Sequence, residues 1–123
     1  MKLDDLKAGS HPGGVIVAAA LESAGIRHTF GIPGTHNIEL YDALDRPGAE
    51  VRPILVTDEQ SAGFMADASA RSGGAVACAN VVPGAGVTHV LSGIGEAYMD
   101  NVPLLLLTCG IRTDTGHKYQ LHA

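Results

Sequence analysis

Four short apolar runs, each bounded by glycine or proline, constrain the fold of this 123-residue chain more than any other feature. The runs span residues 29–32, 51–56, 75–82 and 104–108. Stretches with helical periodicity precede or separate them, at residues 15–24, 37–44, 59–71 and 88–99. Short continuous apolar strands that alternate with helices are typical of a parallel sheet covered on both faces. The pattern therefore predicts an α/β fold, a doubly wound parallel sheet with helices on both faces.

The amino-acid composition narrows the classes of molecule that the protein can bind. Hydrophobic residues make up 46% of the chain, as in a globular protein. The formal net charge is -5, and no cluster of Lys or Arg is present that could bind a phosphate backbone. Aromatic residues make up only 4%, so there is little on which nucleic-acid bases could stack. These features argue against nucleic acid as a partner.

The apolar runs are too short to cross a membrane. The longest, at residues 15–21 and 102–107, fall far short of the roughly 20 residues that a spanning helix requires. The charges before the first run cancel and no suitable cleavage site follows, so it does not resemble a signal peptide. Cys78 and Cys109 lie within or at the end of apolar strands, which favours reduced thiols over a disulfide. We expect a cytoplasmic protein with no membrane partner.

The chain divides into an N-terminal lead-in, residues 1–12, and one domain, residues 13–123. The helix at 59–71 has the clearest boundaries. Thr57 and Gln60 have the spacing of a capping box, and Gly73-Gly74 would end the helix. One face carries mostly small residues that would let the helix pack closely against a sheet or another helix. These residues are Ala62, Met65, Ala66, Ser69 and Ala70.

Ligands in open α/β sheets bind beyond the carboxyl ends of the strands. This rule selects residues 31–36, 57–60, 83–89 and the segment that follows residue 110. Three of the four carry glycine or proline where the chain turns from strand to helix. We expect these segments to lie side by side at one edge of the sheet.

Several common site patterns are missing from these segments. Gly84-Ala85-Gly86 precedes a helix but lacks the Gly-Lys-Ser/Thr of a Walker loop, and His89 stands where a dinucleotide fingerprint has its third glycine. Asp58 and Glu59 are adjacent, so they would point in different directions rather than form a glycosidase pair. The histidines are too scattered to form a metal site, and we predict no metal ligand. Taken alone, Glu59 could simply complement the dipole of its helix.

Four separated segments nevertheless match one family pattern in order and spacing. They are Phe30-Gly31-Ile32-Pro33-Gly34 with Asn37, Leu40 and Asp42-Ala43-Leu44; Glu59-Gln60-x-Ala62 with Met65-Ala66-Asp67 and Ala70-Arg71; Gly84-Ala85-Gly86-Val87-Thr88-His89; and Gly93, Ala97, Asp100 and Pro103 with the strand that leads to Gly110. Together they resemble the pyrimidine-binding (PYR) domain of thiamine-diphosphate-dependent enzymes, specifically the acetolactate synthase-like and 2-oxoacid decarboxylase group. The resemblance extends from Gly13 to Gln120.

The sequence departs from that pattern at four positions. Asp58 stands where many members have histidine, and Ala68 replaces a usual glycine. Ala85 and His89 replace proline and asparagine. These departures leave the subfamily and the substrate open.

The resemblance implies roles for individual residues. Glu59 would hydrogen-bond N1′ of the cofactor's aminopyrimidine and promote its imino tautomer. The remaining cofactor contacts would come from Pro33, Gly34, Gly84, Ala85, Gly86 and His89. Thr35, Tyr119 and Gln120 would face a small 2-oxoacid substrate. The implied reaction is decarboxylation or carboligation, by a lyase or transferase.

The resemblance also implies parts that this sequence lacks. In the family, Mg²⁺ and the diphosphate are held by a separate domain with a Gly-Asp-Gly motif. We therefore expect a truncated domain, inactive alone, that completes its site with a diphosphate-binding domain of another subunit or of the same chain. A homodimer or tetramer is expected, and FAD is possible in the full-length enzyme. The alternatives are a catalytically inactive interaction module and the standalone subunit of a two-chain 2-oxoacid decarboxylase.

Overall fold

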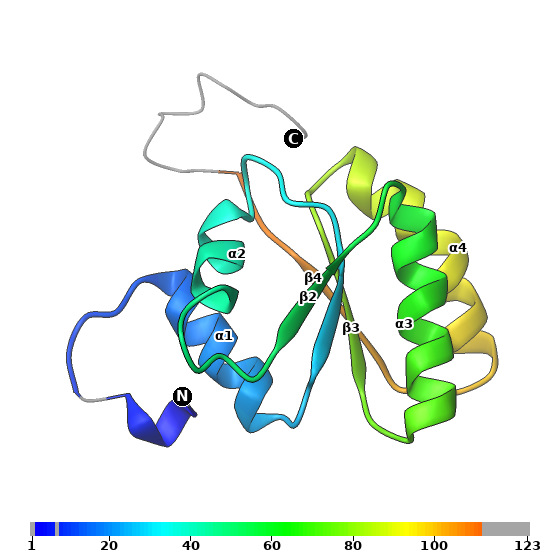
Figure 1. The fold of residues 1–123 in the computed structure, drawn as a ribbon. Coiled ribbons are helices and arrows are strands. Elements are labelled where there is room, and N and C mark those ends of the chain that lie inside the picture. The colour runs from blue at the N-terminus through cyan, green and yellow to red at the C-terminus, as the bar shows by residue number, and fades with distance from the viewer. Residues whose placement is uncertain (1, 7, 112–123) are drawn as a thin grey trace.

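Parallel strands form one sheet in the order β2-β1-β3-β4 in the computed structural model, which describes residues 2–6 and 8–111 (Figure 1). The strands are β1 (His28–Gly31), β2 (Arg52–Leu55), β3 (Ala77–Val81) and β4 (Leu104–Thr108). All three neighbouring pairs are parallel. The chain moves from β1 outward to β2 and then crosses back to β3 on the other side of β1. This reversal confirms the doubly wound α/β fold.

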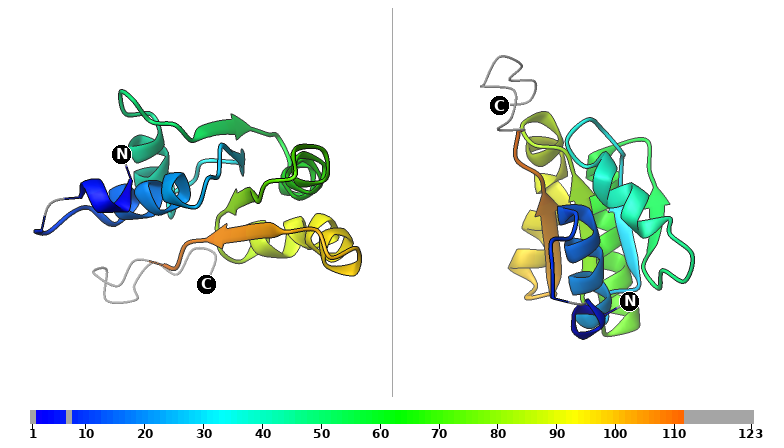
Figure 2. Two further views of the ribbon diagram at one scale, coloured as in Figure 1. Left: turned by 90° about the horizontal axis from the view of Figure 1, so that it is seen from below. Right: turned by 90° about the vertical axis from the view of Figure 1, so that its left-hand side faces the viewer.

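Helices cover both faces of this sheet (Figure 2). They are α1 (Gly13–Ser23), α2 (Ile38–Leu44), α3 (Glu59–Gly73) and α4 (Ala85–Met99), and a short 3-10 helix spans Leu3–Asp5. The pair α1 and α2 lies on one face and the pair α3 and α4 on the other. Within the described residues, no helix has the length and apolar character needed to cross a membrane.

Each face of the sheet has its own apolar core. Cys78 of β3 packs among residues of α1 and α2, whereas its neighbours Ala77 and Ala79 pack among residues of α3 and α4. Successive strand residues point to opposite faces, so β3 must be apolar on both sides, and all five of its residues are buried. Burial raises the pKa of the Cys78 thiol to about 12. Cys78 and Cys109 are both free thiols.

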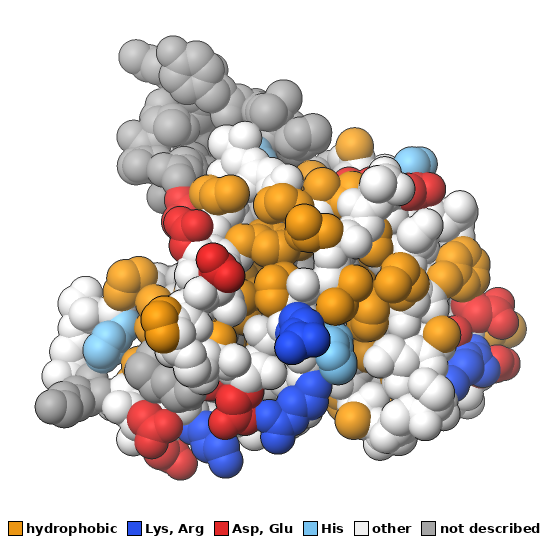
Figure 3. Space-filling model, viewed as in Figure 1, with side chains coloured by type: hydrophobic (Ala, Val, Ile, Leu, Met, Phe, Trp, Pro, Cys, Tyr) orange, Lys and Arg blue, Asp and Glu red, His pale blue; other side chains and the backbone are white. Residues whose placement is uncertain are grey.

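The helices α3 and α4 touch through glycine. A Cβ atom added at Gly93 would lie 2.4 Å from the carbonyl carbon of Gly63 and 2.5 Å from the amide nitrogen of Phe64. The small-residue face predicted for α3 is therefore present, but it includes Gly63. Met65, which was predicted to lie on that face, is 40% exposed. Exposed apolar side chains also lie over β2 and α3 on the face shown in Figure 3. The exposed apolar residues of these two elements include Leu55 and Phe64.

The starts of α3 and α4 differ from the predicted ones. Asp58, not Thr57, is the N-cap of α3, because its Oδ1 atom accepts a hydrogen bond of 2.8 Å from the Gln60 amide. The predicted capping box is therefore wrong. The helix α4 begins at Ala85, three residues before the predicted start, with Gly84 as its N-cap at φ 68°. The predicted glycine end of α3 is confirmed, since Gly74 follows the helix at φ 65°.

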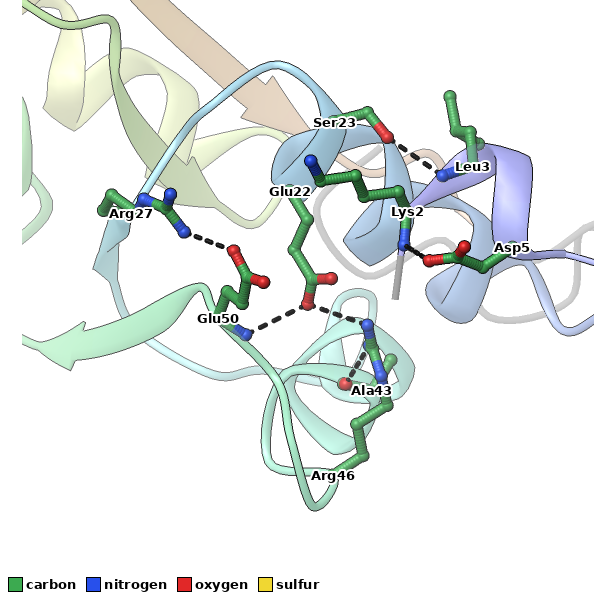
Figure 4. A network of polar contacts seen from close by, with 9 residues as sticks. All are labelled: Lys2, Leu3, Asp5, Glu22, Ser23, Arg27, Ala43, Arg46 and Glu50. Atoms are coloured by element: carbon green, nitrogen blue, oxygen red, sulfur yellow. Dashed lines mark hydrogen bonds and ion pairs between the residues drawn. The ribbon is translucent and has the colours of Figure 1, made fainter.

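A network of polar side chains ties α1 to the segment between α2 and β2 (Figure 4). The buried carboxylate of Glu22 accepts hydrogen bonds from Arg46 Nη2 at 2.8 Å and from the Glu50 amide at 3.1 Å. Arg46 also donates to the Ala43 carbonyl at 2.6 Å, and Arg27 pairs with the Glu50 carboxylate. This network lies near the amino ends of the strands, the edge opposite to the predicted ligand site.

Candidate functional site

Three turns from strand to helix meet at the carboxyl edge of the sheet (Figure 1). They are residues 32–37 after β1, 56–58 after β2 and 82–84 after β3. Because β1 lies between β2 and β3, these turns follow three neighbouring strands. The predicted site segments are therefore gathered at the position where a doubly wound sheet places its ligands.

Asn37 holds the turn after β1 in place. Its side chain is 1% exposed, and its Oδ1 atom accepts a hydrogen bond of 2.7 Å from the Gly34 amide. Its Nδ2 atom donates to the Ile32 carbonyl at 3.2 Å and to Asn80 Oδ1 at 3.4 Å. A Cβ at Gly34 would lie 2.7 Å from Val82 Cγ1, so glycine is needed for the turn to pack against the end of β3. Pro33 and Thr35 are exposed on this turn.

Buried polar groups lie beneath the turn. Asn80 of β3 is 0% exposed, and Tyr41 of α2 is also buried. Burial raises the pKa of the Tyr41 phenol to about 12, so the phenol keeps its proton. Asn80 was not among the residues predicted from the sequence. The sequence did contain a signal for Asn80: it is a single amide inside an otherwise apolar strand, and a buried amide needs a hydrogen-bond partner.

Glu59 is the first residue of α3, at the point where the chain leaves β2. Its side chain is 19% exposed, so its carboxylate is largely covered and still reachable from solvent. The first turn of a helix presents unpaired backbone N–H groups, which favour a carboxylate there. The carboxylate therefore lies where α3 begins, at the carboxyl edge of the sheet.

His89 of α4 approaches both acidic residues at the start of α3. Its Nδ1 atom lies 3.3 Å from Asp58 Oδ1 and 3.4 Å from Glu59 Oε2. All three side chains are partly exposed, and they offer polar atoms within 4.8 Å of one another. One position further along, Gln60 Nε2 donates to Ser92 Oγ at 3.0 Å. Polar contacts thus join the starts of α3 and α4 beside Glu59.

The turn after β3 comes close to the same carboxylate. A Cβ at Gly86 would lie 3.0 Å from Val82 Cγ2 and 3.7 Å from Glu59 Oε1. Gly86 belongs to the first turn of α4, not to a loop as predicted, and so does the exposed Ala85. Gly84 adopts the positive φ that glycine favours. The absence of a side chain at Gly86 therefore leaves backbone, not side chain, facing Glu59.

The structure thus brings together most of the predicted site residues. Glu59, Gly86 and His89 are neighbours, and Val82 contacts both Gly34 and Gly86. Asp58 and Asn37, which were not predicted as site residues, belong to the same edge. Two predicted residues, Tyr119 and Gln120, lie outside the residues that the structure describes.

A hollow of about 460 Å³ opens at the same edge, on the face covered by α1 and α2. It is lined by the start of α1, the start of α2 and the end of β4, including His36 and Cys109. Glu59 and His89 belong to the helices of the other face and do not line it.

Positive side chains lie away from Glu59 throughout the described part of the chain. They are Lys2, Arg27, Arg46, Arg52 and Arg71. Arg27 and Arg52 stand at the amino ends of β1 and β2, and Arg71 is in the last turn of α3. Figure 3 shows the Lys and Arg side chains in its lower half, whereas α3 and α4 start at the top. Among the described residues, the edge that carries Glu59 therefore has no Lys or Arg side chain.

Comparison of the sequence with known proteins shows which family the chain resembles. A sequence model of the thiamine pyrophosphate enzyme N-terminal TPP-binding domain matches residues 12–123. The chain is 45% identical over 95 residues to a probable 2-ketoarginine decarboxylase of Pseudomonas aeruginosa, covering 77% of this chain. It is 42% identical over 96 residues (78% of this chain) to the acetolactate synthase large subunit of Buchnera aphidicola, and 39% identical over 101 residues (82%) to the acetolactate synthase isozyme 3 large subunit of Escherichia coli. In each case the matched region spans 17% of the relative's length.

Proposed function

Since this chain belongs to the thiamine pyrophosphate enzyme family, as its N-terminal TPP-binding domain, we propose that it supplies the pyrimidine-binding half of an active site for 2-oxoacids. The observation that carries the proposal is the Glu59 carboxylate, partly covered at the start of α3 and faced by the backbone of Gly86. Val82 and Glu59 lie so close to Gly86 that this position has little room for a side chain, and glycine there lets the start of α4 pack against the carboxylate.

Glu59 performs the chemical task of this chain. Bound thiamine diphosphate supplies a nucleophilic carbon and an electron sink for the 2-oxoacid. Glu59 holds a proton at N1′ of the aminopyrimidine, so that the exocyclic nitrogen can act as a base. General acid–base groups of this kind contribute roughly 10²- to 10⁴-fold to a rate.

The three turns at the carboxyl edge hold and shape the cofactor site. Backbone groups of Gly84, Ala85 and Gly86 line one side, and Pro33 and Gly34 line the other. His89 completes the group beside Glu59. We assign the substrate contacts to Thr35, Tyr119 and Gln120 and no metal ion to the residues of this chain.

The diphosphate and Mg²⁺ are held by another domain in this proposal. The distribution of charge supports it, because the Lys and Arg side chains visible in Figure 3 lie in its lower half, away from the starts of α3 and α4 at the top. The partner is the diphosphate-binding domain of a second subunit or of the same chain, in a cytoplasmic homodimer or tetramer. FAD belongs, if it is used, to that larger assembly.

The reaction is decarboxylation or carboligation of a small 2-oxoacid, in an acetolactate synthase-like lyase or transferase. The names of the relatives support this class, since they include acetolactate synthases and a 2-ketoarginine decarboxylase. The name of the 2-ketoarginine decarboxylase gives a 2-oxoacid as its substrate, and we infer a substrate with the same 2-oxoacid group for this chain.

The test is Glu59→Gln in the complete enzyme assembly. The amide keeps the shape of the side chain but cannot exchange a proton, so turnover should fall about hundredfold or more. Glu39→Gln is the matched control, because Glu39 also lies in the first turn of a helix at this edge and is not assigned to the cofactor. Turnover of Glu59→Gln within tenfold of the parent would contradict the proton-transfer role.

A second candidate is an interaction module that keeps the fold without binding the cofactor. The exposed apolar side chains over α3, Phe64 among them, favour it. Adding thiamine diphosphate and Mg²⁺ to the complete assembly separates the two. Calorimetric binding and a raised melting temperature support the enzyme, and unchanged stability supports the interaction module.

A further inference from the structure

We propose that His89 is a positioning residue that fixes the direction of the Glu59 carboxylate. The inference rests on the proposed function of Glu59 and gives His89, which the resemblance places among the cofactor contacts, a second role that acts through Glu59. Nδ1 of His89 lies 3.4 Å from Glu59 Oε2 and 3.3 Å from Asp58 Oδ1. The inference requires a hydrogen on Nδ1, which can then be donated to the Glu59 carboxylate.

The packing of two helices sets this contact. Gly63 and Gly93 meet where α3 and α4 touch, at a separation too short for any side chain. Glu59 lies four residues before Gly63, and His89 lies four residues before Gly93. Residues four apart share one face of a helix, so contact between the two glycines brings Glu59 and His89 together one turn earlier. The Gln60–Ser92 hydrogen bond lies between the Glu59–His89 contact and the Gly63–Gly93 contact, as this alignment of the two helices requires.

Asp58 contacts the same ring nitrogen of His89 that faces Glu59. Its Oδ1 atom also accepts from the Gln60 amide at 2.8 Å, which fixes the carboxylate at the N-cap of α3. A fixed carboxylate on one side of His89 limits the rotation of the ring, and the ring in turn limits the rotamers of Glu59.

The exposure of His89 separates its expected role from folding. Its side chain is 65% exposed, so it contributes little to the core. Its described polar contacts are with Asp58 and Glu59. The effect of its removal should therefore fall on the orientation of Glu59 and not on folding.

The kinetic test compares three variants in the complete assembly. His89→Ala should lower kcat roughly tenfold with little change in the substrate KM, as expected for loss of one hydrogen bond to a charged group. His89→Asn should recover to within about threefold of the parent, because the asparagine amide branches from Cγ where Nδ1 does. Ser92→Ala is the control, since it removes a polar link between the same two helices without touching Glu59, and it should leave kcat unchanged.

Three kinetic results would overturn the inference. They are an unaffected His89→Ala variant, a His89→Asn variant as slow as His89→Ala, and an equal loss in Ser92→Ala. The last result would mean that loosening of the helix pair, not the His89 hydrogen bond, explains the loss. If Glu59→Gln is impaired and His89→Ala is not, only this inference fails and the role of Glu59 stands.

A second readout does not depend on turnover. In the assembly without cofactor, nitrogen-15 NMR of the imidazole should show a hydrogen on Nδ1 of His89, in either charge state of the ring. Glu59→Gln should shift the His89 signals, and Glu39→Gln should not. A neutral ring with hydrogen only on Nε2 would overturn the inference, because Nδ1 could then donate to neither carboxylate.

Discussion

Gly63 and Gly93 bring the backbones of α3 and α4 into direct contact, and Glu59 lies beside His89 one helical turn earlier. The site therefore depends on two residues that have no functional groups. They contribute by allowing a short distance between the two helices.

Gly93→Ala should destabilise the chain by about 2 kcal/mol or more, because the new methyl group would overlap the backbone of α3. Gly95→Ala, in the same helix with open space around it, should instead stabilise by about 0.5–1 kcal/mol. Urea denaturation of both variants measures the free energy of unfolding. Equal effects of the two substitutions would contradict the close contact.

Asn37→Ala should release the turn after β1, since the Gly34 amide and the Ile32 carbonyl would lose their partner. We expect a cost of about 1–3 kcal/mol for these unsatisfied groups. The specific readout is hydrogen exchange of the Gly34 amide, which should accelerate relative to amides of β3. Thr35→Ala, on the same turn and exposed, should leave that exchange rate unchanged.

Glu22 should make stability depend on acid pH. Burial raises the pKa of the Glu22 carboxyl, but the hydrogen bonds and positive charges around it, including the Glu50 amide and Arg46, outweigh burial and hold the pKa below its ordinary value of 4.5. A pKa that is lower in the folded state stabilises the fold above the unfolded-state value, and this contribution is lost as pH falls through the folded-state value.

Glu22→Gln should therefore cost about 3 kcal/mol near neutral pH, where it leaves Arg46 without its partner. It should also flatten the fall in stability below about pH 4.5, measured by urea denaturation over a pH series. Glu50→Gln, which affects an exposed pair with Arg27, is the control and should cost less than about 1 kcal/mol. A steeper acid dependence in Glu22→Gln would refute the assignment.

The two cysteines should react at different rates. Burial raises the pKa of Cys78 to about 12 and also raises that of Cys109, which is only partly buried. Because the thiolate is the reactive form, native protein treated with iodoacetamide should be alkylated first at Cys109, and at Cys78 only on unfolding. Peptide mass mapping identifies the modified residue, and Cys109→Ser should leave the native protein almost unlabelled.

The sequence predicted the layers of the fold well, because apolar runs and helical periodicity report directly on burial. The starts of helices were less predictable. Gly84 and Gly86 suggested a loop, but only Gly84 has the unusual backbone angle, and α4 already includes Gly86. Thr57 and Asp58 are both good caps, and only the structure shows that Asp58 accepts the Gln60 amide.

The composition of the candidate site was predictable only in part. Glu59 and the glycine turns were found by their resemblance to a family, and their roles stay predictions. The contact between His89 and Asp58 joins residues 31 positions apart, and it follows from the alignment of two helices rather than from any local pattern. Met65 was misplaced for a related reason. Which face of α3 is buried depends on where α4 packs against it, and α4 packs against the face that carries Gly63.

The all-parallel sheet has a consequence for how the chain acquires its structure. Thr29 of β1 pairs with Cys78 of β3, so the central strand cannot complete its hydrogen bonds until the chain beyond α3 has been made. Contacts between segments so distant in sequence slow folding, and unpaired strands are prone to aggregate. During synthesis, the first half of this domain therefore leaves the ribosome with the unpaired side of β1 open, and chaperone dependence should concentrate in that interval.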